Sequence, residues 1–264
     1  MADPPPKPSP PRLLITAGAT REPIDAVRFL SNRSSGALGL ALAHAAADAA
    51  WEVTLLLGAV DGSAALPPED ADPKGPSGPR LSTVRFESTA DLQAALAEHF
   101  PKADLLVMAA AVSDYRPAPG NRPGLSAQPP AHASGAGGTS GGGAGGRGAS
   151  GGKIERGKSL TLELEATPDL VAECATAKQA HQKIVAFALE EPAQMLERAR
   201  AKLERKRVDA VIANPLRTMG APDIEAALVW PGREPEPAGA RSKTDFARWL
   251  TSRLTEAWFA DRFV

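Results

Sequence analysis

The sequence predicts an α/β protein with a doubly wound, mostly parallel sheet and helices on both faces. Short apolar runs alternate along the chain with amphipathic runs of helical length, the order that a parallel sheet with crossover helices requires. The run at 105–108 is continuously apolar, as in a strand that is buried on both faces. Hydrophobic residues make up 43% and charged residues 23% of the 264, a balance that allows a sizeable core.

The first half of the chain reads as two successive strand–helix–strand units. Its predicted elements are a strand at 13–16, a helix at 37–50, a strand at 53–57, a strand at 84–86, a helix at 91–100 and a strand at 104–111. Because crossovers between parallel strands are right-handed, these helices are expected to cover both faces of one sheet.

The second half continues the pattern after a half-solvated strand. Leu160, Leu162 and Leu164 alternate with polar residues, which predicts an edge or flap strand. The later elements are a helix at 168–177 with Pro168 in its first turn, a strand at 183–187, a helix at 193–207, strands at 208–213 and 228–230, and a helix at 244–258.

Two segments fall outside this pattern. Residues 1–11 contain six prolines and predict a disordered tail, which leaves 12–264 as a single domain. Residues 117–152 are rich in proline, glycine and serine, and predict a disordered insertion in a β flap.

Composition excludes several classes of protein. The formal net charge of −1 argues against a generally basic nucleic-acid-coating protein. The single cysteine, Cys174, can form neither an intramolecular disulfide nor a cysteine-based zinc site. The longest apolar runs are too short to cross a membrane, and the N-terminus is unlike a secretory signal. We therefore expect a cytoplasmic protein with neither nucleic acid nor membrane as partner.

Polar and small residues follow the first predicted strand, where ligands bind in open α/β sheets. Ser34 or Ser35 is expected to cap the following helix, and Gly36 leaves the backbone N–H groups there approachable by a phosphate. The alternative, which needs no ligand, is that Ser-Ser-Gly only caps the helix.

A nicotinamide dinucleotide is the obvious competing ligand for a Rossmann-like sheet. The fingerprint fails in two places, because Gly18 lies about fifteen residues before the helix and Leu57-Gly58 stands where an acidic residue should meet the ribose. An NAD(P)-dependent reductase is therefore the weaker alternative.

The strand at 104–111 is followed by a second group of candidate residues. The small side chains of Ala109, Ala110 and Ala111 allow a ligand to approach the backbone closely. The Asp114 carboxylate is suited to holding Mg²⁺ on a nucleoside triphosphate, although it could also cap a loop.

Several segments in unbroken order resemble the phosphopantothenate–cysteine ligases, also called phosphopantothenoylcysteine synthetases. They are Ile15–Asp25, Val27–Gly36, Ala109–Tyr115, Lys153-Ile154, Thr167–Leu170, Ala186–Ala188 and Ile212–Asn214. The likeness runs from about Arg12 to Trp230.

The resemblance implies a ligase of coenzyme A biosynthesis. CTP or ATP, with Mg²⁺, would activate the carboxylate of 4′-phosphopantothenate as an acyl-nucleotidylate and release pyrophosphate, and L-cysteine would then form the amide. Family members dimerise, so a homodimer is expected. The chain leaves no room for the flavin-dependent decarboxylase of bifunctional versions, so we expect a stand-alone ligase without flavin.

The resemblance also assigns roles to residues of this sequence. Asn32 and Lys153 match catalytic residues, and Asp114 matches the residue near nucleotide and metal. Substrate-binding residues by similarity are Arg28, Ser34, Ser35, Gly36, Ala110 and Ala111. Nucleotide-binding residues by similarity are Asp114, Lys153, Thr167, Pro168, Asp169, Leu170, Phe187, Lys202 and Lys206.

Two features leave alternatives open. Lys202 and Lys206 are four residues apart on one helical face, and without the resemblance they would read as a solvated face. The flap motif has Glu155 where the family usually has lysine, so a non-catalytic nucleotide-binding module remains a second alternative.

Overall fold

The computed structural model describes residues 9–60, 80–119 and 160–263. The predicted tail at 1–11 lies mostly outside these residues, as does nearly all of the predicted insertion at 117–152. The strands of the described part are β1 (Arg12–Ala17), β2 (Arg21–Pro23), β3 (Phe29–Ser31), β4 (Glu52–Leu57), β5 (Leu81–Arg85), β6 (Leu105–Met108), β7 (Tyr115–Pro117), β8 (Leu164–Ala166), β9 (Lys183–Glu190), β10 (Ala210–Pro215), β11 (Asp223–Val229) and β12 (Glu236–Ser242).

Five α-helices and several short 3₁₀ turns connect the described strands. The helices are α1 (Ala37–Asp48), α2 (Thr89–His99), α3 (Leu170–Ala177), α4 (Met195–Lys206) and α5 (Lys243–Trp258). None of the helices in the described ranges is both long enough and apolar enough to cross a membrane.

The central sheet confirms the predicted fold class. Its eight strands have the order β12-β11-β10-β9-β6-β1-β4-β5, and those from β10 to β5 are parallel. From β1 the chain passes outward to β4 and β5, then returns to β6 on the other side of β1. The reversal makes the carboxyl ends of β1 and β6 a topological switch point, where doubly wound proteins bind their ligands.

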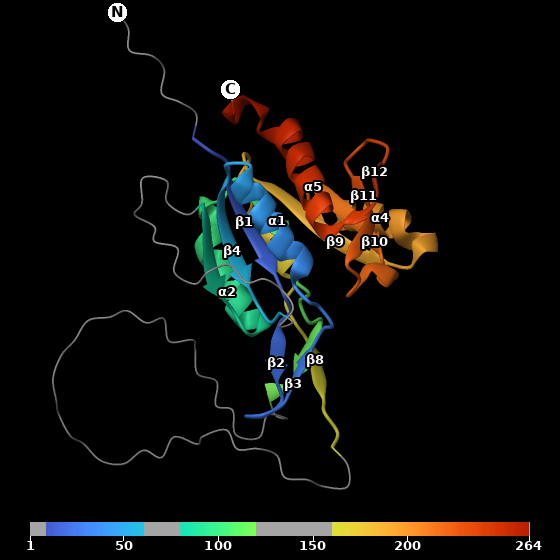
Figure 1. Ribbon diagram of the computed structural model, residues 1–264. Helices are drawn as coiled ribbons and strands as arrows, with labels where there is room; N and C mark the ends of the chain where they lie inside the picture. Colours follow the sequence, from blue (N-terminus) through green and yellow to red (C-terminus); the bar gives the residue numbers. More distant parts are fainter. Residues whose placement is uncertain (1–8, 61–79, 120–159, 264) are drawn as a thin grey trace, which may run out of the picture.

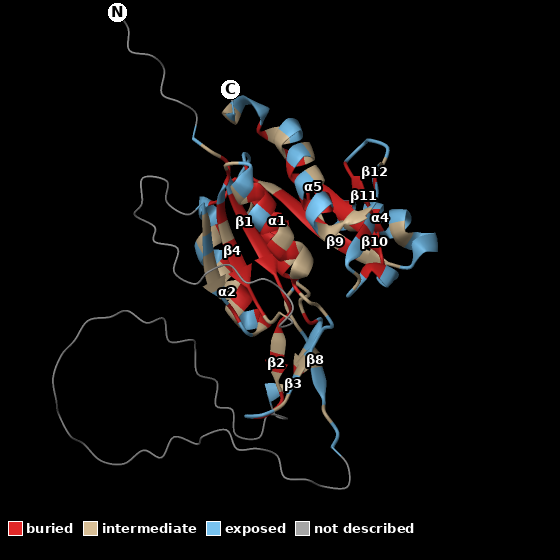
Figure 2. Ribbon diagram, viewed as in Figure 1, coloured by how far each residue is buried: buried red, intermediate tan, exposed pale blue. Residues whose placement is uncertain are grey.

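Helices cover both faces of the sheet (Figure 1). Leu13 and Ile15 of β1 pack with α1 and α5, whereas Leu14, pointing the opposite way, packs with α2, α3 and α4. Figure 2 shows the central strands buried between these layers and the outer helix surfaces exposed. The continuously apolar β6 is buried at every position, as the sequence predicts.

The antiparallel end of the sheet was not predicted in full. The sequence predicts a strand only at 228–230, but β11 begins at Asp223 and a further strand, β12, pairs with it. The β12 sequence contains Pro237 and Gly239 and buries little more than Ala238. Such a strand is tolerated at a sheet edge, where part of the backbone needs no partner.

Two antiparallel pairs, β2–β3 and β7–β8, extend beyond the carboxyl edge of the sheet (Figure 1). We call these two pairs, together with the turn that joins β2 to β3, the arm. Glu22 of β2 is 2% exposed and accepts hydrogen bonds from the backbone N–H and hydroxyl of Thr89, at 2.8 and 2.7 Å. The half-solvated strand predicted from Leu160 begins only at Leu164, and it pairs with β7 as a flap rather than joining the sheet.

Asp104 holds the opposite, amino edge of the sheet together. Its carboxylate, 2% exposed, accepts the backbone N–H of Arg12 at 2.9 Å and pairs with the Arg262 guanidinium at 3.2 Å. Burial alone would raise the pKa of Asp104, but hydrogen bonds and positive charge from Arg12, together with Arg262, lower it below its ordinary value. The start of β1, the start of β6 and the C-terminal turn are thereby connected.

Asp104→Asn is expected to lower the free energy of unfolding at pH 7 by about 1–3 kcal/mol. Because the folded pKa is lowered, the carboxylate stabilises fully above its unfolded pKa of about 3.9, and this stabilisation is lost as the pH falls through the folded value. The difference between wild type and variant in urea denaturation should therefore be constant from pH 7 down to about pH 5 and shrink as the pH falls below about 4. Asp48→Asn, at an exposed position, is the control. A difference that stays constant with pH would contradict this role for the charge.

Candidate functional site

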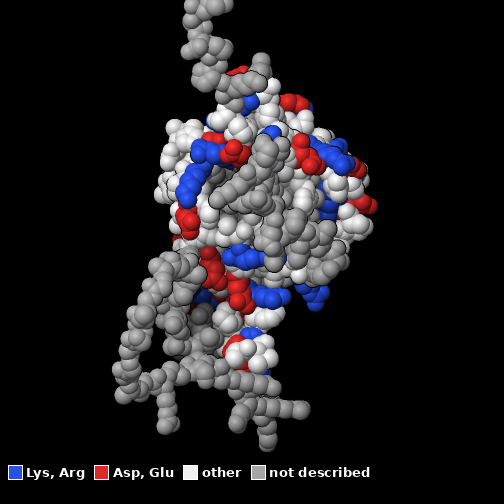
Figure 3. All heavy atoms as spheres, turned by 60° about the vertical axis from the view of Figure 1, so that its left-hand side comes forward, with Lys and Arg blue, Asp and Glu red and all other residues white. Residues whose placement is uncertain are grey.

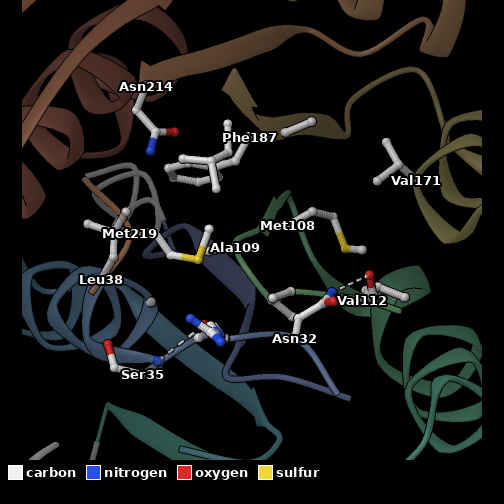
Figure 4. A pocket seen from close by; sticks show the side chains of 18 of the residues that line it. Asn32, Ser35, Leu38, Met108, Ala109, Val112, Val171, Phe187, Asn214 and Met219 are labelled. Atoms are coloured by element: carbon white, nitrogen blue, oxygen red, sulfur yellow. Dashed lines mark hydrogen bonds between the residues drawn. The ribbon is translucent and has the colours of Figure 1, made fainter. Parts of the chain in front are cut away.

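A pocket of about 890 Å³ lies at the carboxyl edge of the sheet. Its walls come from the start of α1, the residues after β6, the base of the arm, and the ends of β9 and β10. Figure 4 shows Asn32 and Ser35 on one side of this pocket and Phe187 and Asn214 on the other. The pocket therefore adjoins the switch point between β1 and β6.

The first turn of α1 presents backbone N–H groups to the pocket. The N-cap is Gly36, with φ of 72°, so the expectation that Ser34 or Ser35 caps this helix is wrong. The two serine side chains instead accept hydrogen bonds from the backbone two residues further on. Ser34 Oγ accepts the N–H of Gly36 at 3.3 Å, and Ser35 Oγ accepts the N–H of Ala37 at 3.4 Å. A cap without a side chain leaves the helix N-terminus open to an anion.

Close packing around the start of α1 explains why positions 18 and 39 are glycine. A Cβ on Gly39 would lie 2.5 Å from the Cβ of Ala17, at the end of β1. A Cβ on Gly18, whose φ is 81°, would lie 2.5 Å from the carbonyl oxygen of Ala59. The absence of both side chains lets α1 begin directly over the carboxyl end of β1.

Asn32 lies between α1 and the segment that follows β6. Its Nδ2 donates to the carbonyl oxygen of Val112 at 2.9 Å. Ala110 and Ala111 line the pocket beside it, and the backbone N–H of Ala110 donates to the Thr16 hydroxyl at 3.0 Å. The polar side chain and the small-residue segment are thus brought together as the sequence predicts.

The base of the arm contributes Asp114, Thr167 and Asp169 to the pocket. The backbone N–H of Thr167 donates to the Asp114 carbonyl oxygen at 2.9 Å, which fixes the two segments side by side. Asp169 caps α3 by accepting the N–H of Ala172 at 3.1 Å, so α3 begins at Leu170 and not at Pro168.

The α4 lysines point into the protein. Lys202 Nζ donates to the carbonyl oxygen of Phe187, and Lys206 forms an ion pair with Asp169. Burial lowers the pKa of Lys202, while the carboxylates of Glu190 and Asp114 act in the opposite direction. The alternative of a solvated helix face is therefore wrong.

Most predicted site residues line this pocket. They are Asn32, Ser34, Ser35, Gly36, Ala110, Ala111, Asp114, Thr167, Pro168, Asp169, Leu170, Phe187, Lys202 and Lys206. Arg28 does not line it and instead pairs with Asp25 in the turn between β2 and β3. Lys153 lies outside the described residues.

Further lining residues were given no role from the sequence. They include Leu38, Gly39, Met108, Asn214, Thr218, Met219, Gly220, Ile224 and Lys243. Asn214, near the end of β10, could have been found from the rule that ligand residues follow parallel strands. Lys243 follows β12, a strand that the sequence analysis did not predict.

The described residues contain no cluster of three or more His, Cys, Asp or Glu side chains that could hold a metal alone. Mg²⁺, however, is often held by one or two carboxylates together with substrate phosphates. Asp114 in the pocket fits that donor set. Figure 3 shows acidic and basic side chains interspersed on one face, without the broad basic surface of a nucleic-acid-binding protein.

The fold and the pocket define a doubly wound α/β protein whose switch point has a helix N-terminus open to the pocket. The chain belongs to the family of the DNA/pantothenate metabolism flavoprotein C-terminal domain, whose model matches residues 10–123 and 147–257.

Two curated relatives are similar in sequence. The coenzyme A biosynthesis bifunctional protein CoaBC of Mycobacterium bovis is 34% identical over 229 residues, covering 83% of this chain and 45% of the relative. A cysteine/cysteine sulfinic acid decarboxylase from an unknown prokaryotic organism is 35% identical over 211 residues, covering 80% and 47%. The chain spans about half the length of these relatives.

Solved structures share the fold. The C-terminal domain of CoaBC superposes with a TM-score of 0.65 at 26% identity, covering 94% of this chain and 95% of that one. A Cab2 H337A mutant in complex with phosphopantothenate-cysteine gives 0.68 at 19% identity, covering 96% and 89%, and at this identity the likeness shows the fold alone.

Gly39→Ala tests the packing that places α1. Helix propensity alone would stabilise the variant by about 1 kcal/mol. The added methyl would lie 2.5 Å from the Cβ of Ala17, so we expect a loss of about 1–3 kcal/mol in the free energy of unfolding by urea. His44→Ala, on the exposed side of the same helix, should not destabilise. A Gly39→Ala variant more stable than wild type would contradict the close contact.

Proposed function

We propose that this chain is a cytoplasmic phosphopantothenate–cysteine ligase that consumes CTP or ATP. The observation that supports it most is that Asn32, the open N-terminus of α1, Asp114 and Lys202 all line the same pocket. The match over 95% of the CoaBC C-terminal domain and the 34% identity to a coenzyme A biosynthesis protein agree with this function.

In the first step, a carboxylate oxygen of 4′-phosphopantothenate attacks the α-phosphorus of the nucleotide and pyrophosphate leaves. Positive charge and N–H donors must offset the charge on the phosphates. The first turn of α1 and the partly buried ammonium of Lys202 supply them in this pocket. Mg²⁺, held by Asp114 and the phosphates, would add further charge neutralisation.

In the second step, the amine of L-cysteine attacks the acyl carbon, the nucleoside monophosphate leaves with the bridging oxygen, and the nitrogen loses a proton to give the amide. The carbonyl oxygen becomes more negative during the attack, so a donor beside it lowers the barrier. We assign this donor to the amide of Asn32, which lines the pocket and whose Nδ2 donates to the loop carbonyl of Val112.

An NAD(P)-dependent reductase and a non-catalytic nucleotide-binding module are the two alternative functions, and each predicts a different property of the pocket. A reductase needs a ribose-binding carboxylate after β4, where the chain has Leu57-Gly58. A non-catalytic module would bind nucleotide but release no pyrophosphate. Pyrophosphate release with 4′-phosphopantothenate and CTP or ATP, with and without cysteine, separates the ligase from both alternatives, and binding of CTP or ATP without turnover then separates the module from the reductase.

Asn32→Ala and Asn32→Asp are expected to reduce ligase turnover by about 10²-fold or more, because each removes a donor that acts on the developing charge. The side chain is exposed, so the melting temperature should change little. Gln93→Ala on α2, away from the pocket, is the control. Wild-type turnover in a folded Asn32 variant would contradict the assignment of Asn32 as this donor.

We also propose that the protein is a homodimer that pairs through the arm. The arm exposes apolar side chains, with exposed fractions of 62% for Val27, 46% for Phe29, 58% for Tyr115 and 44% for Leu164. Several exposed apolar side chains on one projecting part of the fold are typical of an interface, and two-fold pairing of identical surfaces is the commonest arrangement. A dimer through the arm would also allow Arg28 to act on substrate in the partner's pocket.

Val27→Asp is expected to convert the dimer to a monomer in sedimentation velocity, because it places a charge at the most exposed apolar position of the arm. Leu196→Asp, which alters a 38% exposed leucine on α4, should leave the dimer intact. The dimer proposal fails if wild type sediments as a monomer across the concentration range.

A further inference from the structure

Lys243 enters the pocket from a part of the chain that the sequence motifs do not include. β11 is antiparallel to β10, and β12 is antiparallel to β11, so β12 runs in the direction of the parallel strands. Its last residue, Ser242, therefore lies at the same carboxyl edge as the pocket. Lys243 follows as the first residue of α5 and lines the pocket wall.

Lys243 differs from the other lysines of the described pocket wall. Lys202 already donates to a backbone carbonyl, and Lys206 is paired with Asp169. Within the described ranges, Lys243 has no ion pair and its ammonium has no hydrogen-bond partner. Its side chain is partly buried, and burial lowers its pKa.

An ammonium that is partly withdrawn from water is stabilised by an anion more than by any neutral partner. Leu38, Met219 and Ile224 contribute apolar surface to the same pocket, which lowers the local dielectric and strengthens such a pairing. α1 packs against α5, and both helices begin at this edge (Figure 1). Lys243, at the start of α5, thus lies on the helix next to α1, and the N-terminus of α1 opens into the same pocket.

We propose that Lys243 binds a phosphate group of a bound substrate. This inference rests on the proposed ligase function, which assigns the acyl oxygen of the intermediate to the Asn32 amide. The phosphate groups that Lys243 could bind are the β- and γ-phosphates of the nucleotide and the 4′-phosphate of phosphopantothenate. Both present the same chemistry to an ammonium, and ligands that lack one or the other distinguish them.

The test is calorimetric binding to full-length wild type, Lys243→Met, Lys243→Gln and Lys243→Arg. The probes are CTP against CMP, and 4′-phosphopantothenate against pantothenate. Loss of a charge-assisted hydrogen bond should weaken binding of CTP or of 4′-phosphopantothenate by about tenfold or more in the Met and Gln variants. The matching probe without those phosphates should bind as to wild type, and Lys243→Arg should recover part of the affinity.

Lys102→Met, at an exposed lysine that does not line the pocket, is the matched control. The inference is overturned if folded Met and Gln variants bind all probes like this control, or if CTP and CMP weaken equally. A wild-type protein that binds neither substrate and releases no pyrophosphate refutes the proposed function itself. A fully active wild type with an indifferent Lys243→Met variant refutes only the role of Lys243.

Discussion

The close packing of α1 against the end of β1 is the constraint on which the rest of the site depends. Gly39 has no side chain where a methyl would meet Ala17, and Gly18 adopts a left-handed conformation beside the carbonyl of Ala59. β1 is fixed in turn by parallel pairing with β4 and β6. An N-terminus that rests directly on a central strand cannot move without disturbing the core, so its N–H groups are preorganised for an anion.

The segment after β1 extends this constraint to both neighbouring strands. Ala19 exchanges backbone hydrogen bonds with Ala59 beyond β4, and the N–H of Ala111 beyond β6 donates to Gly18. The Thr20 hydroxyl accepts the N–H of Ser113 at 2.9 Å. The loops that bear Asn32 and Asp114 therefore start from one hydrogen-bonded platform, even though they are far apart in sequence.

The sequence predicts the site better than it predicts the edges of the fold. Apolar periodicity identifies the central strands, because burial on both faces permits few residue types, and strand ends then locate most pocket residues. β12 escapes this reasoning because an edge strand needs no apolar pattern, and Lys243 was missed with it. Residue type predicts Ser34 or Ser35 as the cap, but the approach of α1 to Val60 and Gly18 selects Gly36 instead.

The three lysines that line the described pocket differ in what a ligand must displace. Lys206 is held by Asp169, so a phosphate that uses it competes with a carboxylate already in place. Lys202 is held by a neutral carbonyl, which an anion can replace at lower cost. Lys243 has no such partner among the described residues and gains most from a ligand charge. The attraction between a phosphorylated ligand and each lysine is thus expected to differ across the pocket. It should be strongest at the lysine for which the protein supplies no internal counter-ion.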